Sequence, residues 1–163
     1  MAGSRGLGRG PAQTAALLGP GRLWPTRQPL AAMRESAIAP DLALMLAQMV
    51  LEERPALVVE TGSGVSTLVI AYALEKIGRG RVFALEHDPV FAHKTRAEIE
   101  RHGLSAFATV VDAPLEPIEI AGETHRWYAQ RALDQIIGPI DPVVDYGPPR
   151  YVGNMLRYAS LPV

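Results

Sequence analysis

Hydrophobic residues occur along this chain in two patterns, short continuous runs and repeats with helical spacing. The first repeat lies between Pro40 and Pro55 and follows the i, i+3, i+4, i+7, i+8 spacing of an amphipathic helix, with apolar residues Leu42, Met45, Leu46, Met49 and Val50. The apolar run "ALVVE" at 56–60 follows directly. Because this run is too short for a helix and lies between chain breakers, it predicts a buried strand.

The same alternation of helix and strand continues along the chain. Ser66 or Thr67 can cap a second helix that stops at Gly78, and "RVFAL" at 81–85 predicts a second strand. Asp88 and Pro89 form an N-cap and first-turn pair for a third helix, which ends at Gly103 and whose inward positions are Phe91, Thr95 and Ile99. "FATVV" at 107–111 predicts a third strand.

After Asp112 the pattern changes, because prolines interrupt it. "IEIAGETHRWY" predicts a hairpin that turns at Ala121 and Gly122, followed by a helix carrying Leu133, Ile136 and Ile137. "IDPVVDYGPP" at 140–149 then predicts a short fourth strand. Strands alternating with helices predict the doubly wound α/β class with a mostly parallel sheet. Ligands of such sheets bind at the carboxyl ends of the strands, near the point where the winding reverses.

Composition limits the possible binding partners more than it limits the possible reactions. With 163 residues, 48% of them hydrophobic, the chain is long enough for one domain with a real core. Residues 1–30 are rich in Gly, Pro and Arg and predict a flexible tail before a domain at 31–163. The net charge of −1, the absence of cysteine and the lack of a long apolar run favour a cytoplasmic protein that binds neither nucleic acid nor membrane.

The stretch "VVETGSGVSTL" at 58–68 carries the first chemical signal. Gly62 and Gly64 allow a tight turn and a close approach of a ligand to the backbone between the first strand and its helix. A dinucleotide site would favour a third glycine where Thr67 lies, and the carboxylate of Glu60 would repel a pyrophosphate. The stretch therefore favours a cationic ligand that carries an amine.

Two further carboxylates end the next two strands. Glu86 ends the second strand, where an acceptor can bind both hydroxyls of a ribose. Asp112 ends the third, where it can accept from an adenine amino group, and Ala113 leaves room for the ring. Together with Glu60, these residues describe an adenosine with a cationic, amine-bearing tail.

With these motifs the sequence resembles the class I S-adenosylmethionine-dependent methyltransferases, in particular a bacterial group with the motif Glu-x-Gly-Ser-Gly-Val-Ser-Thr, here at 60–67. The likeness continues through "LEHDP" at 85–89, "APL" at 113–115, "WY" at 127–128 and "ID.....GPP" at 140–149, and covers residues 36–163. It implies S-adenosylmethionine as cofactor and transfer of its methyl group, expected to go to an oxygen of a small-molecule acceptor whose identity the sequence does not define. The implied cofactor-binding residues are Glu60, Gly62, Ser63, Gly64, Ser66, Glu86, His87, Asp112 and Ala113.

The sequence departs from the family pattern in two ways. The family has an apolar strand running into Asp-Gly-Pro-Pro, whereas here Pro142 lies in the strand and Tyr146 precedes the glycine, so the candidate catalytic base Asp145 comes one position early. Because side chains alternate along a strand, that shift would turn the carboxylate away from the site unless a bulge corrects it. The family fold also continues beyond the fourth strand. We therefore expect the cofactor half of the fold, with an exposed fourth strand through which copies of the chain could associate.

Two other interpretations of the function remain open beside the methyltransferase hypothesis. The domain could bind the cofactor or a partner without catalysis, and a nucleotide or dinucleotide enzyme on a similar fold is disfavoured by Glu60 and Thr67. Asp88 is expected to be structural, and Trp127 and Tyr128 to be packing residues. The candidate metal ligands His93, His102 and His125 have no second ligand at metal spacing, so no metal is expected and these histidines are predicted to be exposed.

Overall fold

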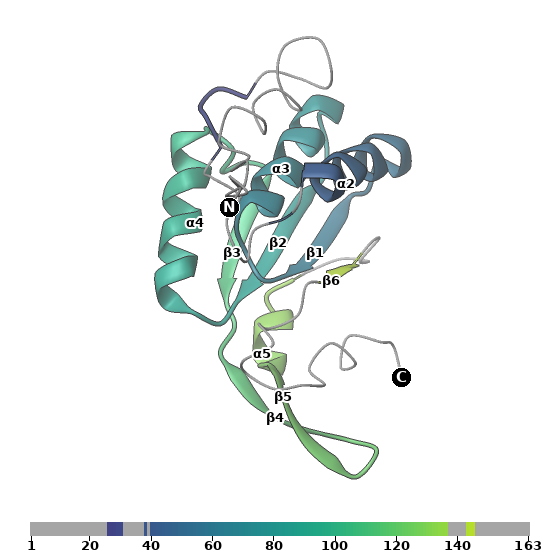
Figure 1. Ribbon diagram of the computed structural model, residues 1–163, viewed down its shortest axis with the longest axis vertical. Helices are drawn as coiled ribbons and strands as arrows, with labels where there is room; N and C mark the ends of the chain where they lie inside the picture. The colour runs from purple at the N-terminus through teal and green to yellow at the C-terminus, as the bar shows by residue number, and fades with distance from the viewer. Residues whose placement is uncertain (1–25, 31–37, 39, 137–142, 146–163) are drawn as a thin grey trace, which may run out of the picture.

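A computed structural model of the chain describes residues 26–30, 38, 40–136 and 143–145 (Figure 1). Its helices are α2 (Pro40–Glu53), α3 (Val65–Ile77), α4 (Pro89–Arg101) and the short α5 (Gln130–Leu133). Its strands are β1 (Leu57–Thr61), β2 (Arg81–Glu86), β3 (Ala108–Asp112), β4 (Leu115–Ile120), β5 (Glu123–Tyr128) and β6 (Val143–Asp145). The predicted strands and the first three predicted helices are confirmed, with their ends displaced by a residue or two.

The main sheet has the order β3-β2-β1-β6, and all of its strand pairs are parallel. The chain adds β2 and β3 on one side of β1 and β6 on the other, so the direction of winding reverses between β1 and β6. This order confirms the expected doubly wound α/β class. It also places the switch point, where such folds bind ligands, at the carboxyl end of β1.

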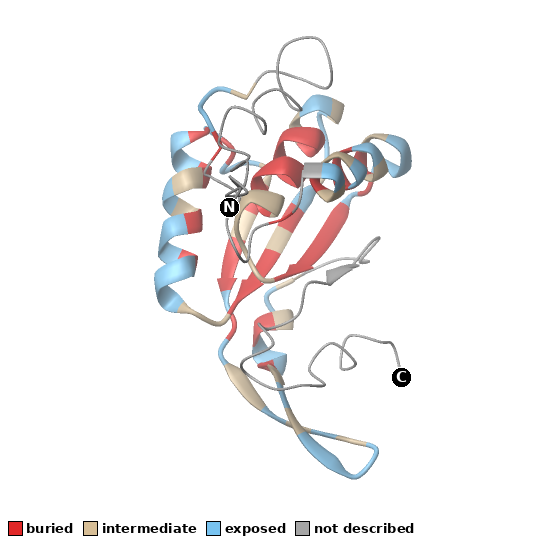
Figure 2. Ribbon diagram, viewed as in Figure 1, coloured by how far each residue is buried: buried red, intermediate tan, exposed pale blue. Residues whose placement is uncertain are grey.

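The two faces of the sheet have separate cores (Figure 2). On one face, Val58, Val82 and Val110 pack with the buried sides of α2, α3 and α4. On the other face, Leu57, Val59, Leu85 and Val111 pack with Tyr128 and Ala132 at the base of the hairpin and in α5. Because both faces are covered, the strands are continuous apolar runs, as their sequences predicted.

Two residues expected to face the core are exposed instead. Met45 of α2 is 56% exposed, because the buried stripe of that helix consists of Ala43, Leu46, Ala47 and Val50. Phe91 of α4 is 48% exposed, since the inward positions are Ala92, Thr95 and Ile99. The ammonium group of Lys94 lies 5.3 Å from the Phe91 ring centroid, which gives the exposed ring a favourable cation–π contact.

The segment after β3 matches its predicted outline. β4 and β5 form an antiparallel hairpin that turns at Ala121 and Gly122 and extends away from the main sheet (Figure 1). The predicted packing roles of Trp127 and Tyr128 are confirmed, since Tyr128 is 3% exposed and Trp127 packs beside it. The helix that follows is shorter than predicted. Leu133 ends it, Ile136 lies in the turn after it, and Ile137 lies outside the described residues.

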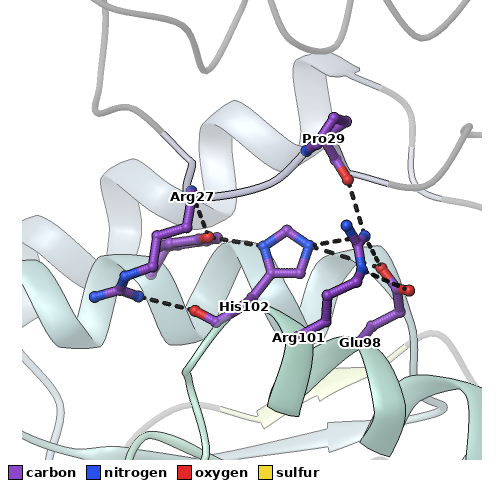
Figure 3. A network of polar contacts seen from close by, with 6 residues as sticks. Arg27, Pro29, Glu98, Arg101 and His102 are labelled. Atoms are coloured by element: carbon purple, nitrogen blue, oxygen red, sulfur yellow. Dashed lines mark hydrogen bonds and ion pairs between the residues drawn. The ribbon is translucent and has the colours of Figure 1, made fainter.

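The part of the predicted tail that the structure describes, residues 26–30, packs against α3 and α4 (Figure 3). The Arg27 backbone N–H donates to the Tyr72 hydroxyl at 2.9 Å, and its guanidinium donates to the His102 carbonyl at 2.9 Å. Leu30 is buried in the core. Residues 26–30 thus contact the helices although they fall within the predicted tail, and residues 1–25 and 31–37 lie outside the described part.

His102 was predicted to be exposed, and this prediction was wrong. The residue ends α4, its side chain is fully buried, and its Nδ1 lies 2.7 Å from the Tyr72 hydroxyl. Burial, together with the neighbouring Arg101 guanidinium, lowers the pKa of His102. Arg101 in turn donates to the Pro29 carbonyl, so the network joins the N-terminal segment to the end of α4 (Figure 3). His93 is exposed as predicted, and His125 is partly buried.

Candidate functional site

The site is built where β1, β2 and β3 end. Strand register aligns Glu60 with Ala84, and Glu86 with Asp112. Residues paired in register point to the same face, so these three carboxylate residues lie on the face covered by α3 and α4. The backbone ladder continues past the strand ends, since Gly62 N–H donates to Leu85 at 2.8 Å. The predicted convergence of Glu60 and Glu86 at one end of the sheet is therefore seen in the fold.

Glu60 is fully buried, and only one of its two carboxylate oxygens has a hydrogen-bond partner among the described residues. Its Oε2 accepts from the Thr67 hydroxyl at 2.6 Å, and the same hydroxyl accepts from Gly64 N–H at 3.0 Å. Its Oε1 is buried without a hydrogen-bond partner among the described residues. A buried carboxylate oxygen without a donor is costly, and such exceptions call for an explanation. A ligand that brings its own hydrogen-bond donor would satisfy it.

Desolvation raises the pKa of Glu60 from 4.5 to about 7. The Ser66 and Thr67 hydroxyls oppose this rise, and the nearby Glu86 carboxylate adds to it. Although Ser66 lies close enough to oppose the rise, none of its atoms makes a hydrogen bond of ordinary geometry to Oε1. Glu60 therefore changes charge near neutral pH, and a cationic ligand group beside it would favour the ionised form.

The turn between β1 and α3 depends on two glycines. Gly62 has φ 93° and Gly64 has φ 153°, backbone conformations that residues with a side chain rarely adopt. A Cβ built on either glycine would meet no atom within 4 Å. The backbone of the turn is thus open to a ligand on the side where a side chain would otherwise stand. Ser66 or Thr67 was expected to cap α3, but the N-cap is Gly64, and the Thr67 hydroxyl accepts from the Gly64 N–H from inside the first turn.

Glu86 is 6% exposed, and donors from two loops hold it. Its Oε2 accepts from the Ser63 backbone N–H at 3.0 Å and from the Ser63 hydroxyl at 2.8 Å. Its Oε1 accepts from Asp88 N–H at 3.1 Å. An ionised carboxylate offers about four acceptor positions. His87 Nδ1 lies 3.2 Å from Oε1 without the geometry of a hydrogen bond, so these three donors leave one acceptor position on Oε1 for a ligand hydroxyl.

The remaining candidate residues lie around Glu86. The His87 ring is mostly buried, lies 6.3 Å from the Tyr128 ring, and has its Nδ1 3.2 Å from Glu86 Oε1. Asp88 accepts from the N–H groups of Val90 and Phe91, which confirms its predicted structural role as the N-cap of α4. Ala113 is fully buried, and its N–H donates to the Glu86 carbonyl at 2.8 Å.

The structure supports a place in the site less clearly for Asp112 and Asp145 than for Glu60 and Glu86. The Asp112 side chain is 71% exposed and pairs with Arg96 at 2.8 Å. Its carboxylate is therefore at the rim of the site, already bound to a cation. Asp145 pairs in register with Thr61, so its backbone lies beside the carboxyl end of β1. Its side chain lies outside the described part of the structure, and its predicted role as a base stays a prediction.

Sequence reasoning missed the polar role of Thr95. This residue of α4 was predicted only as an inward position, yet its hydroxyl lies 3.1 Å from the Ser63 hydroxyl that holds Glu86. The helical spacing that identified Thr95 as buried could not show which polar group it faces. Within the described ranges no three His, Asp or Glu side chains are grouped as a metal ion would require, and no helix is long and apolar enough to span a membrane.

Residues 59–144, which contain the carboxyl ends of β1, β2 and β3, match the protein family described as "Methyltransferase domain". The chain belongs to this family. No curated protein matches the chain. The match covers more than half of the sequence of this methyltransferase domain, from the middle of β1 into β6.

Two solved structures are similar to this methyltransferase domain. Cofactor-bound Rv0187 from MTB superposes with a TM-score of 0.55 at 24% identity, over 69% of this chain and 46% of that one. An O-methyltransferase from Bacillus cereus in complex with SAH has a TM-score of 0.44 at 28% identity, over 48% of this chain and 36% of that one. This chain thus spans less than half the length of these structures. The similarity to Rv0187 supports the α/β fold.

Proposed function

We propose that this methyltransferase domain binds S-adenosylmethionine at the carboxyl ends of β1 and β2. It then transfers the methyl group of this cofactor to an oxygen of a small-molecule acceptor. The observation that carries the proposal is the burial of Glu60, whose Oε1 has no donor among the described residues. Burial raises the pKa of this carboxyl to about 7. A ligand amine at this position would supply both a donor and a positive charge. The motif resemblance and the family membership support the same cofactor.

The residues present fit such a ligand. Glu60 would accept from the amine of the methionine part, and the open side of the Gly62–Gly64 turn would lie along it. Glu86 would accept from a ribose hydroxyl through its free acceptor position on Oε1, and His87 would lie beside this contact. When bound, the cofactor supplies a methyl group on a positively charged sulfur. Two buried carboxylates suit that charge and oppose the pyrophosphate of a dinucleotide.

Transfer to an oxygen depends mainly on alignment and on the exclusion of water. The acceptor hydroxyl must also lose a proton, and Asp145 is the candidate base because its backbone lies next to β1 at the same end of the sheet. Asp112 would bind the adenine amino group only at the expense of its ion pair with Arg96, so we assign it a weaker role than Glu86.

Calorimetric titration tests the proposal directly. The wild-type chain is titrated with S-adenosylmethionine, S-adenosylhomocysteine and NAD, in parallel with Glu86→Ala and the exposed control Glu100→Gln in α4. We expect the first two ligands to bind, NAD not to bind, and Glu86→Ala to weaken binding by about tenfold or more, the effect of losing a hydrogen bond to a charged group. A folded wild-type chain that binds NAD in preference to S-adenosylhomocysteine would refute the proposal. Binding without methyl transfer to any acceptor would favour a non-catalytic domain.

A further inference from the structure

The hydrogen bonds of Glu86 limit how many ligand hydroxyls its carboxylate can accept. A ribose presents two adjacent hydroxyls, and an ionised carboxylate offers about four acceptor positions, two on each oxygen. Ser63 fills both positions on Oε2, with its backbone N–H at 3.0 Å and its hydroxyl at 2.8 Å. The Asp88 N–H fills one position on Oε1 at 3.1 Å. One position is therefore left for two ribose hydroxyls.

The Ser63 hydroxyl is held beside Oε2 from its other side as well. An ionised carboxylate has no proton to donate, so the Ser63 proton points to Glu86. The Ser63 oxygen also lies 3.1 Å from the Thr95 hydroxyl, and this second contact therefore uses the Thr95 proton. Thr95 is 5% exposed and belongs to α4, which packs on the sheet. Because the Ser63 oxygen has a partner on each side, it stays next to Oε2 and keeps that position filled.

We infer that Glu86 binds only one of the two ribose hydroxyls. One hydroxyl donates to the free position on Oε1, whereas the other finds no acceptor on this carboxylate. The site should therefore bind an adenosyl ligand that lacks the second hydroxyl, a deoxyribose form, as tightly as the ribose form. This inference rests on the proposed function, because it requires an adenosine-containing ligand at Glu86.

Calorimetric titration with S-adenosylhomocysteine and with its 2′-deoxy and 3′-deoxy analogues tests the inference. We expect the wild type to bind one analogue within about twofold of S-adenosylhomocysteine. The other analogue should bind about tenfold more weakly, the factor that one hydrogen bond to a charged group supplies. Glu86→Ala has no carboxylate for either hydroxyl, so it should bind all three ligands within about twofold of one another.

Ser63→Ala tests which group blocks Oε2. The substitution removes the hydroxyl and keeps the backbone N–H, so one position on Oε2 becomes free beside the position on Oε1. The analogue that the wild type binds well should now bind about tenfold more weakly than S-adenosylhomocysteine, because the second hydroxyl has gained an acceptor. Ser105→Ala, at an exposed serine before β3, is the control and should keep the wild-type preference.

The outcomes distinguish a failure of this inference from a failure of the proposed function. Similar weakening of both analogues in the wild type, or weakening of neither, would overturn the inference while Glu86→Ala still reports the cofactor site. A Ser63→Ala variant with the wild-type preference would overturn it too. A folded wild-type chain that binds none of the three ligands would overturn the proposed function and the inference with it.

Discussion

Glu60→Gln is expected to stabilise the fold while it impairs the site. The substitution keeps the shape of the side chain and an oxygen for the Thr67 hydroxyl, but it removes the buried charge. Burial raises the pKa of Glu60 from 4.5 to about 7. Because a tenfold change in an ionisation constant corresponds to about 1.4 kcal/mol, ionised Glu60 costs the folded state on the order of 3 kcal/mol above pH 7.

The sign of the pH dependence follows from proton binding. Below about pH 4.5 Glu60 is protonated in both the folded and unfolded chains, and its charge costs nothing. Between pH 4.5 and about 7 the unfolded chain releases this proton while the folded chain retains it, so stability falls as the pH rises. Above pH 7 the loss is complete. A glutamine at position 60 has no such dependence.

Denaturant unfolding at pH 5, 6, 7 and 8 measures this effect. We expect the free energy of unfolding of Glu60→Gln to exceed that of the wild type by no more than about 1 kcal/mol at pH 5 and by on the order of 3 kcal/mol at pH 8. Glu100→Gln, an exposed position in α4, is the control and should show no comparable change. A difference between Glu60→Gln and wild type that stays constant from pH 5 to pH 8 would contradict the assignment of a buried, titrating Glu60.

Three further predictions follow from the same contacts. The affinity of the wild type for S-adenosylhomocysteine should increase with pH through about 7, because the ligand ammonium favours ionised Glu60, and calorimetry on Glu60→Gln should show no such increase. His102 has a lowered pKa, so the wild type should lose stability as the pH falls below 6.5 while His102→Gln does not, and thermal unfolding at pH 5 to 8 would contradict this if their difference in Tm stayed constant. Gly80→Ala should destabilise by about 2 kcal/mol or more, since its Cβ would lie 2.4 Å from the Pro55 carbonyl oxygen. Gly122 has a similar φ, but a Cβ there would meet no atom within 4 Å. Denaturant unfolding should therefore show that Gly122→Ala lowers the free energy of unfolding by only about 1 kcal/mol.

The fold was predictable because each strand carries its own local signal. The runs at 56–60, 81–85 and 107–111 are apolar because both faces of the sheet are covered, and glycine or proline bounds most of the elements. The helix faces were less predictable. Met45 and Phe91 satisfy the helical spacing, yet close packing on the sheet favours the smaller Ala43 and Ala92. The spacing alone therefore predicted burial for two residues that are exposed.

The site was predictable only where a strand end defines it. Glu60 and Glu86 follow directly from the pattern of strand, turn and helix, and the register brings both to one face. Thr95 and His102 lie in helices, and their polar partners Ser63 and Tyr72 are distant in sequence. Such pairings depend on how helices pack on the sheet, which the pattern of a single helix does not contain.

Glu60 Oε1 and His87 Nδ1 both depart from the rule that buried polar groups find hydrogen-bond partners, and only Glu60 carries a carboxylate. Glu86 is held by three donors, whereas Glu60 keeps one oxygen without a donor among the described residues, at the point where the winding of the sheet reverses. Folding alone would favour a neutral residue there, because ionisation of Glu60 costs the fold on the order of 3 kcal/mol. A ligand that brings a positive charge and a donor offsets that cost only when it is bound. The local conflict at Glu60 is therefore best explained by a function in binding, since proteins break local rules of stability mainly at functional sites.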